Sequence, residues 1–202
     1  MDRTLSFYSE KLASNSPVPG GGGASAYVAS LGTALGQMVC NLTFNKPKYV
    51  DSADEMKQLC NECDSIRKEL NELVDKDEEA FLPLSKAYKL DKNDLNRDDI
   101  MEKALISACR VPLRIMELCC SAADCVDTIS EKGSTIVISD AGCAAACLQA
   151  ALKSAYLNVM INLKGMKDQS KKTAIKAYAD DMLNKYSVLC EQILQFVIEK
   201  IG

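Results

Sequence analysis

The chain has 202 residues, a length that suits a single domain and suffices to bury a hydrophobic core. Its formal net charge of −4 gives no general attraction for nucleic acid or anionic lipid, so neither is an expected partner. No apolar run reaches the roughly 18 residues of a membrane span, and no apolar segment follows the first three residues as in a signal peptide. We therefore expect a cytoplasmic protein without membrane contact.

Ten cysteines and the absence of histidine narrow the possible chemistry. Most cysteines lie among alanine, leucine, valine or isoleucine, where a reduced thiol behaves as a small hydrophobic group. The one Cys-x-x-Cys pair, Cys60 and Cys63, has neither a second pair nor a histidine to complete a zinc site. We expect no disulfides and no bound metal. Without histidine, acid-base chemistry is left to Asp, Glu, Lys, Tyr, Cys or the substrate itself.

The first predicted elements are a short amphipathic helix over residues 2–13 and a glycine-rich turn. Pro17 and Pro19 favour an extended approach to the turn. Gly20 to Gly23 remove every Cβ, so this backbone is able to bend sharply, adopt a positive φ and come close to another group. The following small-residue helix ends near Asn41. A glycine turn at a helix N-terminus is a natural anion site, and an ordinary loop before a packed helix is the alternative.

A long helix follows a loop that contains Lys46 and Lys48. Apolar residues at a 3-4 spacing from Met56 to Phe81 predict this helix. Asp77 belongs to an acidic run within it, and stepping back from Phe81 by three and four residues places Asp77 on the buried side. A lone carboxylate on an apolar face needs a partner or a function. A solvated acidic face is the alternative interpretation.

The helical pattern resumes over residues 100–125, where Pro112 predicts a kink. A further helix, again rich in small residues, is predicted over residues 141–163. Ser139 and Asp140 are expected to cap its start, and a plain capping role is the alternative to a catalytic one for Asp140.

The end of the chain completes a helical pattern. Asn158 and Asn162 lie one turn apart and therefore on the same face of their helix, where binding a ligand and hydrogen bonding to another helix are both open. Residues 175–201 carry a 3-4 stripe suited to bundle packing. No segment alternates convincingly at period two. The sequence therefore predicts an all-α fold, a single-domain bundle of about five or six helices over residues 1–202.

Several motifs together resemble the cyclodeaminase/cyclohydrolase family, in order from about residue 4 to residue 200. The motifs are Pro17–Gly22 with Asn41, Asp77–Phe81, Val111–Leu113, Ser139–Gly142 and Asn158–Leu163. Two positions depart from the family pattern. The family usually has Ser where this chain has Gly23, and Gly-Asn with a second Asn where this chain has Gly133-Ser134-Thr135.

The resemblance implies an all-helical subunit that forms a homodimer and binds folate near the glycine turn. It implies chemistry at the N5/N10 bridge of tetrahydrofolate, with no metal or redox cofactor. In the cyclodeaminase direction, N10 attacks the N5-formimino carbon and ammonia leaves. In the cyclohydrolase direction, water adds to the bridge carbon of 5,10-methenyltetrahydrofolate and N5 leaves. A catalytically silent folate-binding or helical scaffold protein is the alternative, and a helical interaction module without a ligand is a third.

The resemblance also assigns expected roles to single residues. Asp77 is expected to act as the catalytic carboxylate, with Asp140 sharing that role. The expected substrate-binding residues are Pro19, Gly20, Gly21, Gly22, Asn41, Lys46, Ser139, Asn158 and Asn162. Within this set the two asparagines would orient the pterin or the intermediate. Lys46, together with Lys48, would meet the glutamate tail of a folate that carries one or more glutamates, and solvated loop charges are the alternative.

Overall fold

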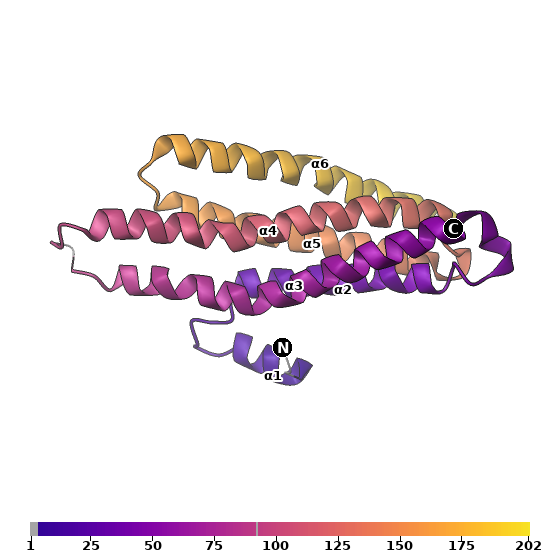
Figure 1. Ribbon diagram of the computed structural model, residues 1–202, viewed down its shortest axis with the longest axis horizontal. Coiled ribbons are helices and arrows are strands. Elements are labelled where there is room, and N and C mark those ends of the chain that lie inside the picture. The colour runs from indigo at the N-terminus through magenta and orange to yellow at the C-terminus, as the bar shows by residue number, and fades with distance from the viewer. Residues whose placement is uncertain (1–3, 92) are drawn as a thin grey trace.

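The fold consists of α-helices and two short 3-10 segments, with no strand in the part of the chain that the computed structural model describes, residues 4–91 and 93–202 (Figure 1). In chain order these elements are α1 (Leu5–Leu12), α2 (Gly21–Asn41), η1 (Pro47–Ser52), α3 (Ala53–Tyr88), α4 (Arg97–Lys132), η2 (Thr135–Val137), α5 (Ile138–Lys164) and α6 (Gln169–Ile201). The predicted all-α bundle of about five or six helices is confirmed.

The helices form two layers, with α3 and α4 in front of α2 and α5 in the view of Figure 1, while α6 covers α4 and α5 along one side. α1 lies beside α2, where its buried Tyr8 packs against Tyr27. Small residues allow the close approach of α2 and α5. A Cβ at Gly32 would lie only 3.0 Å from the carbonyl oxygen of Ala144 on α5, so a larger residue would require α2 and α5 to shift apart.

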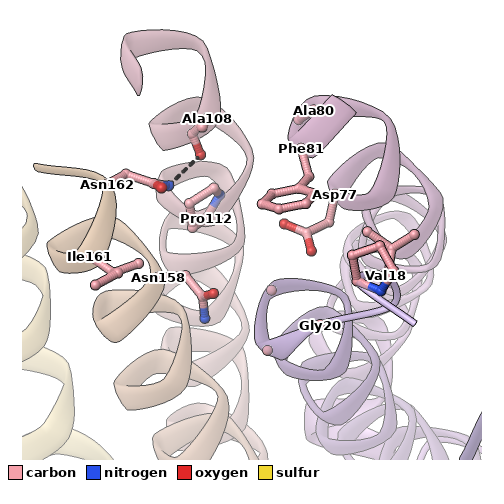
Figure 2. Close-up of a pocket in the computed structure, with 13 residues that line it drawn as sticks. Val18, Gly20, Asp77, Ala80, Phe81, Ala108, Pro112, Asn158, Ile161 and Asn162 are labelled. Atoms are coloured by element: carbon pink, nitrogen blue, oxygen red, sulfur yellow. Dashed lines mark hydrogen bonds between the residues drawn. The ribbon is translucent and has the colours of Figure 1, made fainter. Parts of the chain in front are cut away.

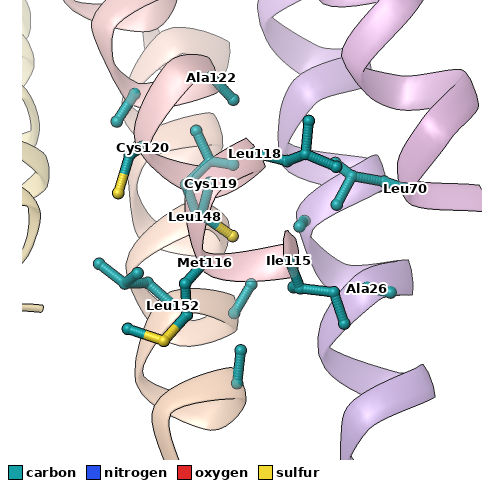
Figure 3. Packing of buried hydrophobic residues seen from close by; sticks show 14 of the residues in the cluster. Ala26, Leu70, Ile115, Met116, Leu118, Cys119, Cys120, Ala122, Leu148 and Leu152 are labelled. Atoms are coloured by element: carbon teal, nitrogen blue, oxygen red, sulfur yellow. The ribbon is translucent and has the colours of Figure 1, made fainter. Parts of the chain in front are cut away.

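The core lies between the two layers, where large side chains of α3, α4 and α5 meet small residues of α2 (Figure 3). Ile115 and Leu148 are fully buried there, and each such side chain contributes about 1.5–3 kcal/mol through the hydrophobic effect. Several cysteines share this core, as expected. Burial raises the pKa of Cys109 to about 11, so its thiol stays protonated and packs as an apolar group.

Two helices begin earlier than the sequence pattern predicts. α5 starts at Ile138, so Ser139 and Asp140 lie inside its first turn, and the expected capping role of these two residues is wrong. In that turn the Asp140 carboxylate still favours the helix because it faces the positive end of the helix dipole. α6 starts at Gln169, where the side chain of Asp168 accepts a hydrogen bond from the Lys171 N–H at 3.0 Å.

Among the described residues, one helical segment, Thr135–Lys164, has the length and composition of a membrane span. It consists of η2 and α5, and α5 packs against α2, α4 and α6. Contact with three neighbouring helices accounts for part of the apolar composition, since 44% of its apolar stretch is buried in the bundle.

Candidate active site

A cavity of about 170 Å³ lies where the glycine turn faces α3, α4 and α5 (Figure 2). It is lined by Pro17, Val18, Gly20, Gly21, Gly22, Asp77, Ala80, Phe81, Ala108, Pro112, Asn158, Ile161 and Asn162. Most of this lining is apolar, and a few polar groups converge on it from separate segments of the chain. This arrangement is typical of a small-molecule site.

Asp77 reaches across from α3 to the first turn of α2. The N–H of Gly23 donates a hydrogen bond to Asp77 Oδ2 at 2.8 Å. Because Gly20 occupies the cap position of α2 and has no side chain to offer, the carboxylate of Asp77 satisfies an N–H that would otherwise lack a partner. The predicted inward orientation of Asp77 is confirmed. Its contact with α2 is a cap supplied by another helix, which the sequence pattern alone does not reveal.

Position 22 requires glycine because Asp77 leaves no space for a side chain there. A Cβ at Gly22 would lie 2.1 Å from Asp77 Oδ1, far inside van der Waals contact. The expected positive φ is wrong, because no glycine among residues 4–91 and 93–202 has one. Gly23, where the family usually has Ser, contributes its backbone N–H, which serine would also offer. That departure therefore leaves the contact with Asp77 possible.

The surroundings of Asp77 favour its protonated form. Burial raises the pKa of the Asp77 carboxyl above its usual value of 3.8, the hydrogen bond from Gly23 opposes this shift, and the charge of Glu78 adds to it. A carboxyl group whose pKa lies closer to neutrality accepts and returns a proton more readily near pH 7 than an ordinary aspartate. The site thus contains a group suited to general acid-base chemistry.

Asn162 forms a hydrogen bond between helices. Pro112 has no N–H to donate to the carbonyl of Ala108 one turn earlier, so this carbonyl lacks its usual partner within α4. The Nδ2 of Asn162 donates to it at 3.0 Å, as the dashed line in Figure 2 shows. The interhelical alternative for Asn162 is therefore confirmed, and the same residue also lines the cavity.

Asn158 has spare hydrogen-bonding capacity at the cavity wall. Its Nδ2 donates to the carbonyl of Ser154 at 2.8 Å, and a Cβ at Gly21 would lie 3.1 Å from this nitrogen. Within residues 4–91 and 93–202, no residue donates a hydrogen bond to Asn158 Oδ1. This oxygen and the second N–H of the amide are therefore available to a ligand.

Four other predicted site residues lie at the opposite end of the bundle. Asn41 ends the helix that the glycine turn begins, about 30 Å away at 1.5 Å per residue. Asp140 precedes Asn158 by 18 residues on α5, a separation of about 27 Å, and Ser139 lies beside it. Lys46 follows α2 at this far end. Within one subunit, the structure does not bring these residues to Asp77. Pro19 is buried next to the turn and does not line the cavity.

A network of hydrogen bonds orders the far end. Lys46 Nζ donates to Ser134 Oγ at 2.9 Å, and the N–H of Ser134 donates to Thr43 Oγ1 at 2.9 Å. The N–H of Thr135 donates to Tyr49 Oη at 3.1 Å, and hydrogen bonding from Thr135 lowers the pKa of Tyr49 to about 8. Ser134 and Thr135, where the family usually has asparagine, therefore anchor the turn before α5.

Comparison with known proteins identifies close relatives of this chain. The sequence profile of the formiminotransferase-cyclodeaminase family matches residues 4–181. The chain is 36% identical to the methenyltetrahydrofolate cyclohydrolase of Methylorubrum extorquens, over 100% of this chain and 99% of that protein. It is 31% identical to the formimidoyltransferase-cyclodeaminase of Rattus norvegicus over 83% of this chain, and the matched region is 32% of the rat protein.

A solved structure supports the same grouping. The crystal structure of formiminotetrahydrofolate cyclodeaminase from Thermotoga maritima is similar to this structure, with a TM-score of 0.85 and 28% sequence identity. The match covers 98% of this chain and 96% of that chain. The resemblance drawn from the sequence motifs is thereby confirmed. The chain belongs to the formiminotransferase-cyclodeaminase family.

Proposed function

We propose that this protein is a folate one-carbon enzyme that hydrolyses the N5/N10 bridge of 5,10-methenyltetrahydrofolate. The observation that carries the proposal is the half-buried Asp77 carboxylate in a largely apolar cavity, held against a glycine turn. The relative named methenyltetrahydrofolate cyclohydrolase aligns with all of this chain, which supports this substrate.

Asp77 would first balance the charge of the substrate. The N5–C–N10 bridge of a methenyl folate is a cationic amidinium, and a carboxylate in an apolar cavity interacts with such a cation more strongly than it would in water. Phe81 and Pro112 provide flat apolar surfaces beside the carboxylate, against which a pterin ring would pack (Figure 2).

Asp77 would then transfer protons in both halves of the reaction. As the oxygen of water bonds to the bridge carbon, the carboxylate takes one proton from that water, which leaves a neutral hydroxyl intermediate. When the bond from this carbon to N5 breaks, N5 takes the proton from Asp77, and the hydroxyl loses its own proton to become the carbonyl of 10-formyltetrahydrofolate. The reaction releases one proton in total. The raised pKa of Asp77 suits both steps.

The second candidate reaction is deamination of 5-formiminotetrahydrofolate, which the solved structure from Thermotoga maritima favours through its similarity to this chain. N10 would attack the formimino carbon, and Asp77 would protonate the amine that leaves as ammonia. In that case the protein would be a lyase of histidine degradation. Neither reaction changes an oxidation state, so we propose that the protein needs no redox cofactor. We also propose that it needs no metal, because Asp77 would carry the proton transfers, and that it acts in the cytoplasm.

A side-by-side assay tests this proposal. Purified protein is supplied with 5,10-methenyltetrahydrofolate and, separately, with 5-formiminotetrahydrofolate, while methenyl absorbance and ammonia are followed. We expect the methenyl absorbance to be lost faster than in buffer. Release of ammonia from the formimino compound would instead assign the deaminase. Turnover of neither compound would favour the catalytically silent folate-binding or scaffold alternative.

We also propose that the protein acts as a homodimer, as the family resemblance implies. α2 and α5 lie in the same layer, and both carry exposed apolar residues. Leu31 and Met38 of α2 and Leu42 just after it are 37–46% exposed, and Leu157 and Ile161 of α5 are more than 60% exposed. An apolar face of this kind is a candidate for protein association.

A two-fold dimer on this face would bring the predicted site residues near Asp77 close to those at the far end of the partner subunit. Leu31 is the middle residue of α2, and a two-fold axis beside it at right angles to the helix would make two copies of α2 run in opposite directions. The glycine turn of one subunit would then approach the far end of the partner, where Lys46 and Asp140 lie. This geometry would account for their separation from Asp77 within one chain.

A further inference from the structure

A second cavity continues the line of the first toward the end of the bundle where α3 connects to α4. Its volume is about 210 Å³. It is lined by Tyr88, Arg97, Asp98, Met101, Glu102, Leu105, Gly165 and Lys167. The proposed reaction gives these residues no role.

The two cavities share the same sides of the same helices. On α4, Arg97, Met101 and Leu105 face the second cavity, and Ala108 and Pro112 continue this 3-4 spacing into the first. Two other walls also extend from the first cavity into the second. On α3 the wall runs from Phe81 to Tyr88, and at the end of α5 it runs from Asn162 to Gly165. Arg97 lies 11 residues before Ala108, or about 16 Å along the helix.

Arg97, whose charge lies near that of Asp98, carries a buried polar atom in this cavity. Its Nε is buried, and no residue in the ranges 4–91 and 93–202 accepts a hydrogen bond from it. The other charged groups are engaged, since Asp98 pairs with Lys167, and Glu102 accepts hydrogen bonds from two backbone N–H groups, including that of Lys167 at 2.8 Å. A buried guanidinium N–H without an acceptor is costly, so this cavity is suited to an anion.

We propose that Arg97 binds a carboxylate of the folate glutamate tail, an inference that rests on the proposed function. A folate with its N5/N10 bridge at Asp77 must direct its p-aminobenzoyl ring and glutamates out of the first cavity. The second cavity lies along the same helices, its wall includes apolar Met101 and Leu105, and its cation has the forked geometry that matches a carboxylate. A chain of several γ-linked glutamates covers the distance more easily than a single one.

Lys46, the residue that the sequence suggests for this task, is less suited to it in this subunit. Its ammonium group already donates to Ser134 Oγ, and it lies beyond the opposite end of α2 from the glycine turn. The two assignments make different predictions, so variants of both residues belong in one experiment.

The test compares KM and kcat for 5,10-methenyltetrahydrofolate carrying one glutamate and carrying three. Arg97→Ala should raise KM for the triglutamate by about tenfold, the loss expected for one hydrogen bond to a charged group, and should leave kcat unchanged. The monoglutamate should be affected less. Arg97→Lys keeps the charge and should recover part of the affinity. Arg110→Ala, which removes an exposed arginine of the same helix outside both cavities, is the matched control and should change neither constant.

A second readout does not depend on turnover. p-Aminobenzoyl-triglutamate lacks the pterin, and its affinity for the wild-type protein should fall about tenfold in Arg97→Ala but not in Arg110→Ala. Two results would overturn the inference while the proposed function stands. One is that Arg97→Ala binds p-aminobenzoyl-triglutamate as tightly as the wild type. The other is that an active Arg97→Ala enzyme keeps the wild-type ratio of the triglutamate KM to the monoglutamate KM. If Lys46→Ala alters that ratio and Arg97→Ala does not, the tail binds at the far end instead. If the wild-type protein binds this fragment through Arg97 but turns over neither 5,10-methenyltetrahydrofolate nor 5-formiminotetrahydrofolate, the proposed enzymatic function is refuted and the Arg97 inference stands.

Discussion

At the scale of single residues, the site depends on how closely the α2 backbone approaches Asp77. The carboxylate accepts from the N–H of Gly23 and occupies the space where a side chain at Gly22 would stand. The sequence shows that four glycines precede a helix and that Asp77 faces inward. It does not show that these two features meet, because their contact joins residues 54 positions apart.

The glycine turn gives a prediction with a matched control. Gly22→Ala places a Cβ where Asp77 Oδ1 lies, so the carboxylate must move, and we expect a large loss of turnover with helicity retained in circular dichroism. Gly20→Ala should cost less turnover than Gly22→Ala, because no protein atom lies within 4 Å of a Cβ at position 20 and Asp77 stays in place. If the two substitutions reduce turnover equally, the turn does not serve to leave space for the Asp77 carboxylate.

The raised pKa of Asp77 predicts how its replacement changes stability with pH. The folded protein binds this proton more tightly than the unfolded chain, whose carboxyl has the ordinary pKa of 3.8. Ionising Asp77 therefore costs the folded protein stability. This cost is absent at pH values below the pKa of the unfolded chain and is fully present at pH values above the raised pKa of the folded protein. Asp77→Asn removes that cost and can still accept from Gly23. Its gain in Tm over the wild type should be larger at about pH 7 than at about pH 3.5. A gain that is the same at both pH values would contradict the shift.

At the scale of helices, apolar spacing predicts most of the bundle and misses several helix starts. α6 begins six residues before Ile175, the first residue of its predicted stripe, because Asp168 provides a cap that apolar periodicity does not register. Pro112 was expected to kink its helix. As predicted, the proline does not end the helix: α4 is continuous from Arg97 to Lys132, and Pro112 determines which helix supplies a partner to the Ala108 carbonyl.

This exchange of partners is measurable in a double-mutant cycle. Asn162→Ala should lower the free energy of unfolding by about 1–3 kcal/mol, because it leaves the Ala108 carbonyl without a hydrogen-bond donor. In a Pro112→Ala background the new N–H of residue 112 is able to bond that carbonyl, so the cost of Asn162→Ala should shrink. Urea unfolding of the four proteins gives the coupling. Costs that simply add would mean that Pro112 and Asn162 do not share this carbonyl.

At the scale of the whole molecule, the sequence resemblance finds site residues without showing their positions. Gly20, Gly21, Gly22, Asp77, Asn158 and Asn162 converge on one cavity. Asn41, Lys46, Ser139 and Asp140 lie at the other end of the bundle. One signal was present in the sequence, since 18 residues of continuous helix between Asp140 and Asn158 already imply a separation of about 27 Å.

The proposed dimer makes a prediction at this scale. Leu31→Glu puts a charge at the middle of the exposed α2 face, where it would be desolvated against its symmetry mate, and it should shift the protein from dimer to monomer in sedimentation analysis. Leu95→Glu is the control, because Leu95 is 98% exposed and lies outside that face. A wild-type protein that sediments as a monomer, or a Leu31→Glu variant that stays dimeric, would contradict this assembly.

The central claim is that Asp77 carries the proton-transfer chemistry, and turnover of 5,10-methenyltetrahydrofolate by Asp77→Asn tests it most directly. Asparagine nearly matches the shape of aspartate but neither accepts the proton nor balances the amidinium charge. We expect a rate reduced by about 10²- to 10⁴-fold in a protein that melts at or above the wild-type temperature. A folded Asp77→Asn protein with near-normal turnover would contradict the account and move the chemistry to Asp140 or to the substrate itself.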